Sequence, residues 1–195
     1  MFQNSKVKNI LKQGEIGEVV IFRSSFGFNL QDPSNFRLKK ELGGGAFLDV
    51  AGYPVSALRF FFDSEPVKSN GFKKNRSDGL DVSGAFSVLM ENGVVGEISY
   101  GFNQCYECFY QTIGTKGSIF LNRCYTTPET MENTITIKIG SNEKTLTIPR
   151  ANHFTLMLDN FCKKIINSAS REGTYLDITK QAKAMELVRK GLVKA

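Results

Sequence analysis

Two side chains that can hold or move a proton stand four positions apart in one apolar segment. Asp49 and Tyr53 lie within residues 43–54, GGGAFLDVAGYP, and this spacing places both on the same face of a helix. An unpaired buried carboxylate is costly, so we expect Asp49 to line a cavity or to meet a specific donor. A phenol, with a pKa of about 10, is a suitable proton donor to a carbonyl that is being reduced. A structural Asp–Tyr pair that ties the helix to a loop is the alternative interpretation.

Other residue types that often carry catalysis are scarce. His153 is the only histidine, and at the start of an amphipathic segment it is more often a capping or surface residue than a base. Cys105 and Cys108 have the spacing of metal ligands, but side chains three apart on a strand point to opposite faces, and no second Cys or His pair follows. Cys124 and Cys162 are interpreted as buried thiols. The sequence therefore predicts no metal site.

Neither standard phosphate-binding turn occurs. The chain has no Gly-x-Gly-x-x-Gly and no Gly-x-x-x-x-Gly-Lys-Ser/Thr sequence. The glycines at 43–45 do not have dinucleotide-binding spacing, because Leu48 stands where the last small residue should be. We therefore expect no complete nucleotide-binding domain within this chain.

Length and composition fit one globular domain over residues 1–195. Of the 195 residues, 41% are hydrophobic and 23% are charged. There is no run of about 18 apolar residues and no basic segment followed by an apolar core at the N-terminus, so we expect neither a membrane span nor a secretion signal. The four cysteines are then expected to be reduced, and the expected location is the cytoplasm.

The formal net charge of +6 raises the question of nucleic-acid binding. The basic residues form short groups, at 39–40, 73–76 and 163–164, and acidic residues return beside most of them. A solvated surface is the favoured interpretation, and we expect no nucleic-acid partner. A modest positive field would still attract a phosphorylated small molecule.

The candidate residues need a scaffold, which the periodicity of the sequence predicts. β-Branched and aromatic runs separated by turn residues, such as the Asn92–Gly93 pair, predict strands, and apolar residues spaced by threes and fours predict helices. Pro54 is expected to kink the central helix near Tyr53. Helices are predicted at 3–13, 43–62, from 152 and from 179, and strands at 18–29, 66–75, 81–91, 94–103, 107–114, 118–122 and, as a hairpin, 134–149.

Strands in one block with helices at both ends predict an α+β fold, an open, mainly antiparallel β-sheet with helices packed on one face. The second face of such a sheet has no helices of its own. An uncovered face of this kind usually meets another surface, so we expect self-association through it, as a dimer or a tetramer.

The segment 43–54 resembles the Gly-Gly-Gly-x-x-x-Asp-x-x-x-His/Tyr motif of the Gfo/Idh/MocA superfamily of oxidoreductases (glucose-fructose oxidoreductase, inositol dehydrogenase, rhizopine catabolism). Residues 99–102 and 122–128 are most similar to the branch that reduces keto groups on nucleotide-linked deoxysugars. Further segments are similar to the C-terminal domain of that superfamily in order and rough spacing, and the resemblance covers nearly the whole chain: 11–19, 35–37, 91–93 and 114–118.

The resemblance implies the C-terminal half of an NAD- or NADP-dependent oxidoreductase acting on a sugar or nucleotide-sugar. Such enzymes join a Rossmann domain to an open-sheet domain that supplies half of the active site and the oligomer contact. By this resemblance, Tyr53 is the proton donor or acceptor at the reacting carbinol, and Asp49 orients neighbouring groups. Arg37 is expected near the cofactor or the substrate phosphate. The other substrate- or cofactor-binding residues that the resemblance implies are Gly44, Gly45 and His153.

The chain departs from that superfamily in lacking the Glu-Lys-Pro motif, which carries the catalytic lysine of the Rossmann domain. Hydride transfer needs a nicotinamide held in productive geometry, so we expect this chain alone to bind no NAD or NADP tightly and to be inactive or nearly so. The chain is then an excised or truncated C-terminal half or a natural standalone domain. The alternative function is a non-catalytic binding or assembly module that kept the sheet for self-association.

Overall fold

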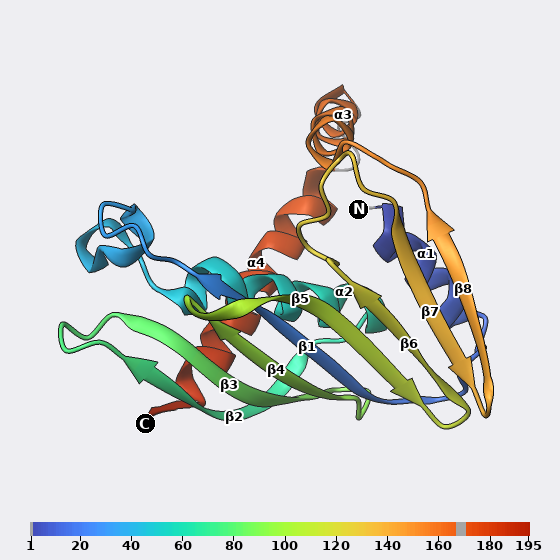
Figure 1. Ribbon diagram of the computed structural model, residues 1–195, viewed down its shortest axis with the longest axis horizontal. Helices are drawn as coiled ribbons and strands as arrows, with labels where there is room; N and C mark the ends of the chain where they lie inside the picture. Colours follow the sequence, from blue (N-terminus) through green and yellow to red (C-terminus); the bar gives the residue numbers. More distant parts are fainter. Residues whose placement is uncertain (1, 167–170) are drawn as a thin grey trace.

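One nine-stranded sheet organises the part of the chain that the structure describes (Figure 1). A computed structural model describes residues 2–166 and 171–195. Its helical elements are α1 (Phe2–Lys12), η1 (Phe36–Leu38), η2 (Lys40–Leu42), η3 (Phe47–Ala51), α2 (Gly52–Phe62), α3 (His153–Ile166) and α4 (Arg171–Lys190). Its strands are β1 (Val19–Asn29), β2 (Pro66–Asn75), β3 (Asp81–Met90), β4 (Val95–Gly101), β5 (Asn103–Gly114), β6 (Gly117–Asn122), β7 (Asn133–Ile139), β8 (Asn142–Ile148) and β9 (Leu192–Lys194).

The strand order is β8-β7-β6-β5-β1-β4-β3-β2-β9. Most neighbouring strands run antiparallel, whereas β1 pairs with β4 and β2 pairs with β9 in parallel. Because β1 lies between β5 and β4, the first strand of the chain is central in the sheet. Figure 1 shows α1, α2 and α4 on one face. The predicted fold class, an open and mainly antiparallel sheet with helices on one face, is confirmed.

The core lies between the sheet and α2. Strand β1 turns Phe22 toward α2, where its ring centroid is 6.0 Å from that of Phe61 and 5.8 Å from that of Tyr110 on β5. Leu58 packs on Gly96 of β4, where an added Cβ would come within 2.6 Å of a Leu58 methyl carbon. Packing this close leaves no room for α2 to shift along the sheet, so the helix that carries the candidate residues is firmly placed.

The predicted helix at 43–62 is helical only from Phe47 onward, and it is not uniform. Residues Phe47–Ala51 form a π-helical turn ahead of α2. Pro54 cannot donate a backbone hydrogen bond, and its ring crowds the carbonyl of Val50 four positions earlier. A π turn widens the backbone just ahead of this position, and Asp49 lies within it, whereas the kink expected near Tyr53 stays a prediction.

The two C-terminal helices differ from the sequence prediction in one boundary and in burial. α4 begins at Arg171, earlier than the predicted start near 179, because the apolar period begins only where the helix reaches the sheet, at Ala184 and Val188. No described residue of α3 is buried, so Cys162 is exposed and its interpretation as a buried thiol is wrong. β9 was not predicted, since three residues are too few to show a period.

The remaining predicted elements agree with the structure in type and, except for β5, which begins at Asn103 and not at the predicted 107, closely in position. The Asn92–Gly93 pair forms the turn between β3 and β4, where the Gly93 N–H donates to the Met90 carbonyl at 2.9 Å and Gly93 has a φ of 85°. Every helix in the described part of the chain is too short or too polar to span a lipid bilayer.

Candidate active site

Arg37 and Asp49 meet across the loop that precedes the π turn. The Asn35 side chain fixes the start of η1 by accepting the Arg37 backbone N–H at 3.1 Å. The Arg37 guanidinium donates through Nε to Asp49 Oδ2 at 2.9 Å, and it lies 4.8 Å from the centre of the Phe36 ring. The expectation that Asp49 meets a specific donor is confirmed. The pair that ties the helix to a loop is Asp49–Arg37, and no hydrogen bond joins Asp49 to Tyr53 within the described ranges.

Gly44 and Gly45 hold this loop closed. Their N–H groups donate to the carbonyl oxygens of Lys39 and Arg37, respectively, both at 3.0 Å. A Cβ at Gly44 would lie 2.5 Å from the Arg37 carbonyl oxygen. Gly45 has a φ of +127°, and a Cβ there would lie 2.5 Å from an Asp81 carboxylate oxygen. Both glycines are required for close packing of the chain against itself, and their Cβ positions face protein atoms.

Asp81, the first residue of β3, anchors the start of the π turn. Its Oδ2 accepts the backbone N–H of Phe47 at 2.6 Å, one of the helix-start N–H groups that have no intrahelical partner. The Tyr100 hydroxyl is buried nearby without a hydrogen-bond partner in the described residues. Burial, reinforced by the Asp81 charge, raises the Tyr100 pKa above its usual range. Asp81 therefore sets where the helix that carries Asp49 begins.

Tyr53 lies in the first turn of α2 with its ring held and its hydroxyl free. The ring meets Phe26 of β1 edge-on, with centroids 5.1 Å apart and planes at 90°, and its centroid is 5.7 Å from that of Tyr125. Tyr53 is 43% exposed, and no described residue forms a hydrogen bond with its hydroxyl. The site thus presents a positioned phenol to solvent, four residues after the Asp49 carboxylate.

Tyr125 stands behind Tyr53 and is itself fixed by hydrogen bonds. Its hydroxyl lies 2.8 Å from Ser24 Oγ, and Ser24 donates to the Phe109 carbonyl at 2.8 Å. Because the single Ser24 hydroxyl proton is already used, Tyr125 is the donor to Ser24. Burial raises the Tyr125 pKa well above its usual range, so this phenol stays neutral and supports the Tyr53 ring.

The segment that follows β6 carries Tyr125, and its next contacts are with Tyr106 of β5. The hydroxyls of Tyr106 and Thr126 lie 2.7 Å apart in a hydrogen bond. Arg123 has a positive φ of 46°, and its guanidinium carbon lies 4.7 Å from the centre of the Tyr106 ring. Beneath them, Cys108 Sγ accepts the Tyr125 backbone N–H at 3.3 Å and the Thr126 hydroxyl at 3.5 Å. The segment is therefore pinned to β5 at several points.

Cys108 and Cys124 form a buried thiol pair under this segment. A hydrogen bond from Cys124, together with those from Thr126 and the backbone, lowers the pKa of Cys108, whereas burial raises the pKa of Cys124. Cys105 is exposed while Cys108 is buried, as strand alternation predicted. Among the described residues, no three His, Cys, Asp or Glu side chains gather in a way that could hold a metal ion.

His153 begins α3, and its contacts do not include the other candidate residues. Its neighbour Asn152 caps the helix by accepting the Thr155 N–H at 3.0 Å, and the Asn152 amide binds Glu129 in the segment between β6 and β7. The His153 Nδ1 atom is buried without a partner in the described part of the chain, and burial lowers the His153 pKa. No described contact joins His153 to Arg37, Asp49 or Tyr53, and its role in substrate or cofactor binding stays a prediction.

Hydrogen bonds from α4 hold the first turn of α2 in place. Gln181 Nε2 donates to the Gly52 carbonyl oxygen at 3.3 Å. The Gln181 amide oxygen accepts a hydrogen bond from Arg59 at 2.9 Å, and the buried Arg59 guanidinium also binds Glu65 at 2.6 Å and Asp177 at 2.9 Å. The Arg59 hydrogen bond holds the Glu65 pKa below its usual range. This network links the position of α4 to the first turn of α2.

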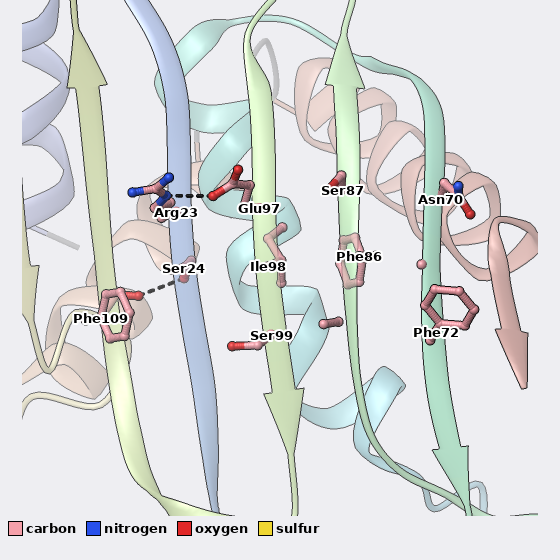
Figure 2. A pocket seen from close by; sticks show the side chains of 12 residues that line it. Arg23, Ser24, Asn70, Phe72, Phe86, Ser87, Glu97, Ile98, Ser99 and Phe109 are labelled. Carbon is pink, nitrogen blue, oxygen red and sulfur yellow. Dashed lines mark hydrogen bonds and ion pairs between the residues drawn. The ribbon is translucent and has the colours of Figure 1, made fainter. Parts of the chain in front are cut away.

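A hollow of about 520 Å³ lies on the helix-free face of the sheet (Figure 2). Its polar centre is the ion pair of Arg23 Nε with Glu97 Oε2 at 2.6 Å. Tyr53 does not line it, so this hollow is a second surface and not the candidate active site. A row of residues across the strands, most of which line this hollow, carries small side chains in its middle and aromatic rings at its ends: Phe109, Ser25, Ser99, Ala85 and Phe72.

The fold brings together some of the residues singled out from the sequence and adds others. Arg37 and Asp49 are paired, and Tyr53 follows them in the next turn. Sequence reasoning missed Asp81, because a carboxylate at a strand start carries no mark of the helix that it caps. It also missed roles for Tyr125 and its neighbours, although residues 122–128 were already singled out by their resemblance to nucleotide-sugar ketoreductases.

Comparison with known proteins gives this fold a family context. Residues 4–120 match the family model described as the GFO/IDH/MocA C-terminal domain. The chain is 31% identical over 172 residues to a dTDP-3,4-didehydro-2,6-dideoxy-alpha-D-glucose 3-reductase from Saccharopolyspora spinosa, a match over 88% of this chain and 50% of the relative. It is 27% identical over 123 residues to the NADP(+) D-xylose 1-dehydrogenase from Haloarcula marismortui, over 58% of this chain and 34% of that relative.

A solved structure has the same fold. The 3-ketoreductase from Actinomadura kijaniata, in complex with NADP and TDP-benzene, superposes with a TM-score of 0.90 at 25% identity, over 98% of this chain and 59% of that chain. The present chain spans about half the length of the curated relatives that it matches.

Proposed function

This chain belongs to the GFO/IDH/MocA family as a C-terminal domain, and from that premise we propose that it is the substrate-binding and self-associating half of an NAD(P)-dependent oxidoreductase acting on a sugar or nucleotide-sugar. The observation that carries the proposal is the Tyr53 phenol, with its ring fixed by Phe26 and its hydroxyl free. The dTDP-sugar 3-reductase among the relatives supports a keto group on a nucleotide-sugar as the reacting centre.

We assign to Tyr53 the proton that carbonyl reduction requires. A ketone that accepts a hydride becomes an alkoxide, which must gain a proton to become the carbinol. The Tyr53 hydroxyl donates that proton to the substrate oxygen, and in the reverse direction it accepts the carbinol proton. A nicotinamide, when bound, supplies the hydride. The exposed position of Tyr53 supports this role, because the substrate oxygen must reach its hydroxyl.

Arg37 and Asp49 shape the site beside that proton. Their ion pair keeps the loop from Phe36 to Gly45 closed on the π turn, so it orients the helix start that Tyr53 follows. Only Nε of the Arg37 guanidinium is engaged by the described residues. Its two terminal nitrogens remain available as donors to a substrate oxygen.

The geometry of Gly44 and Gly45 does not favour a phosphate cradle for a dinucleotide in the described part of the chain. The Cβ positions of Gly44 and Gly45 face the loop carbonyls and Asp81, whereas a pyrophosphate-binding glycine exposes its backbone to the ligand. We therefore expect NAD or NADP to be held mainly by another domain. The chain alone is expected to bind neither cofactor tightly and to be inactive or nearly so.

Two surfaces of the chain support contacts with other protein chains or domains. The helix-free face, centred on the Arg23–Glu97 ion pair, is expected to meet a second copy of the chain. On α3, Phe154 is 75% exposed, and Leu158 and Phe161 continue the same apolar stripe into solvent. Cysteines without disulfide bonds, together with nicotinamide chemistry, support a cytoplasmic location.

The test is a fused enzyme. The nucleotide-binding half of the Saccharopolyspora spinosa reductase is joined to the N-terminus of this chain, and NADPH oxidation is followed with a dTDP-linked 3-keto sugar. We expect turnover that is lost with Tyr53→Phe. In parallel, titration of the unfused chain with NADH and NADPH, followed by nucleotide fluorescence, should show no tight binding.

The matched control is the intact Saccharopolyspora spinosa reductase, which establishes that substrate and cofactor are competent. If the fusion folds, binds NADPH and still does not turn over any keto sugar, the chain is a non-catalytic binding or assembly module and the oxidoreductase proposal is wrong. Tight NADPH binding by the unfused chain would instead contradict the assignment of the cofactor to another domain.

A further inference from the structure

Arg123 is a cation without a carboxylate partner. Most arginines of the described ranges form ion pairs: Arg23, Arg37, Arg59, Arg76 and Arg189. Arg123 forms none, and none of its guanidinium N–H groups donates to a described residue. A guanidinium offers five donors in a planar fork that matches carboxylate and phosphate oxygens. Its whole donor set is therefore available to an anionic ligand.

The Arg123 side chain is held in place without using those donors. Its guanidinium lies over the Tyr106 ring at 4.7 Å, a contact that fixes the plane of the group while leaving its edges open. Its backbone is fixed as well, since the Arg123 carbonyl accepts the Thr127 hydroxyl and φ is 46°. For a non-glycine residue this conformation is uncommon and persists where surrounding structure enforces it. A pre-positioned cation loses little freedom when it binds.

Arg123 is connected to Tyr53 through a short series of contacts. Two residues along the chain, Tyr125 packs on the Tyr53 ring at 5.7 Å. The next residue, Thr126, shares a hydrogen bond at 2.7 Å with the Tyr106 hydroxyl, the same ring on which Arg123 lies. The proton donor and the cation are thus linked through Tyr125, Thr126 and Tyr106, so both belong to one continuous set of contacts.

We propose that Arg123, oriented by Tyr106, binds the diphosphate of the substrate while Tyr53 acts on its sugar. This rests on the proposed function and makes it more specific: the substrate is a nucleoside-diphosphate sugar and not a free sugar. The relatives include both kinds of enzyme, a dTDP-sugar reductase and a D-xylose dehydrogenase. Arg37 was the sequence-based candidate for a phosphate, but its charge is already paired with Asp49. Arg123 is the unpaired cation that the fold connects to Tyr53.

Binding to the unfused 195-residue chain tests this assignment by titration calorimetry. The probes are dTDP, inorganic pyrophosphate, thymidine, NADP and D-xylose, each with the wild-type chain, Arg123→Gln, Arg123→Lys and Arg150→Gln. Arg150 is the matched control because it too has no carboxylate partner among the described residues but makes no described contact with Tyr53, Tyr125 or Tyr106. Thermal melts establish that each variant is folded.

We expect dTDP and pyrophosphate to bind the wild-type chain and Arg150→Gln alike, and raised salt to weaken both. Arg123→Gln should weaken dTDP by roughly tenfold to a hundredfold, the usual effect of losing hydrogen bonds to a charged group. Arg123→Lys should recover part of the affinity, since it keeps the charge but not the fork. Thymidine should bind more weakly than dTDP and should not respond to Arg123→Gln.

Three results would overturn the assignment. The wild-type chain could bind thymidine or D-xylose as tightly as it binds dTDP. Arg123→Gln could bind dTDP with the same affinity as Arg150→Gln does. Arg123→Gln could lower the affinity for NADP but not for dTDP, which would mean that Arg123 binds the cofactor. None of these binding results decides whether the fused enzyme turns over, because the proposed oxidoreductase activity is measured separately in that enzyme. A fourth result would come from the fused enzyme itself: if it reduces free keto sugars as readily as dTDP-linked ones, the proposed activity stands and the diphosphate assignment is wrong.

Discussion

The ring of Tyr53 meets the ring of Phe26 edge-on, with centroids 5.1 Å apart and planes at 90°. Phe26 belongs to β1, which lies inside the sheet with a neighbour on each side, so the phenol is positioned against a constrained strand. The contact uses apolar ring atoms and leaves the hydroxyl unengaged. The position of Tyr53 and its chemistry therefore depend on different atoms, and mutation can separate them.

Tyr53→Phe removes the hydroxyl and keeps the ring. In the fused enzyme we expect turnover to fall by roughly 10²–10⁴-fold, the usual contribution of a positioned proton donor. The free energy of unfolding should stay within about 0.5 kcal/mol of wild type, because the lost hydroxyl has no partner in the described residues. Steady-state NADPH oxidation and urea unfolding measure the two effects. Unchanged turnover would remove Tyr53 from the mechanism.

Phe26→Leu is the complementary change, since it keeps the Tyr53 hydroxyl and removes the ring that positions it. We expect turnover to fall about tenfold or more, because small displacements of a catalytic group are costly. Stability should fall by about 1–3 kcal/mol, since Phe26 is only 4% exposed. The same two assays apply. A stability loss with full turnover would show that the edge-on contact does not position the phenol.

Some features of this site could be predicted from the sequence, and others could not. The need of Asp49 for a donor follows from the presence of one carboxylate in an otherwise apolar segment, which is local information. That Arg37 is the donor depends on the path of a loop with no periodicity. The contact between Tyr53 and Tyr125 depends on the order of strands, and the parallel pairing of β1 with β4 leaves no trace in either strand. Elements were predictable from local pattern, and contacts between distant elements were not.

Asp81 should act through the start of the π turn. Asp81→Ala leaves the Phe47 N–H without its acceptor at 2.6 Å, and we expect a loss of about 1–2 kcal/mol in the free energy of unfolding. Asp81→Asn keeps an oxygen acceptor and should lose less. Urea unfolding of the two variants side by side provides the measurement. Equal losses would mean that the carboxylate does not act as a cap.

The helix-free face should mediate self-association, which a charge in its row of small side chains can test. Ala85 lies in that row between Ser99 and Phe72. Ala85→Arg places a long cation where two faces would meet, so we expect a shift to monomers in analytical ultracentrifugation without loss of secondary structure. Ser141→Arg, in the exposed turn between β7 and β8, is the matched control. An unchanged mass for Ala85→Arg would place the oligomer contact elsewhere.

Stability at acidic pH should depend on the Arg59–Glu65 pair. The Arg59 hydrogen bond holds the Glu65 pKa below its ordinary value of 4.5, so the folded chain takes up this proton less readily than the unfolded chain does. The stabilisation is fully present above about pH 4.5 and disappears as pH falls through the lower folded-state pKa.

Glu65→Gln has no charge to titrate, so its deficit relative to wild type should be largest near pH 7, about 1–2 kcal/mol, and should shrink below about pH 4.5. Urea unfolding at pH 7, 5 and 3.5 follows the deficit directly. Glu143→Gln, which breaks the more exposed pair with Lys138, should show little deficit at any pH, because exposed ion pairs contribute about 0–1 kcal/mol. A deficit for Glu65→Gln that stays constant across this range would mean that the Glu65 charge does not stabilise the fold.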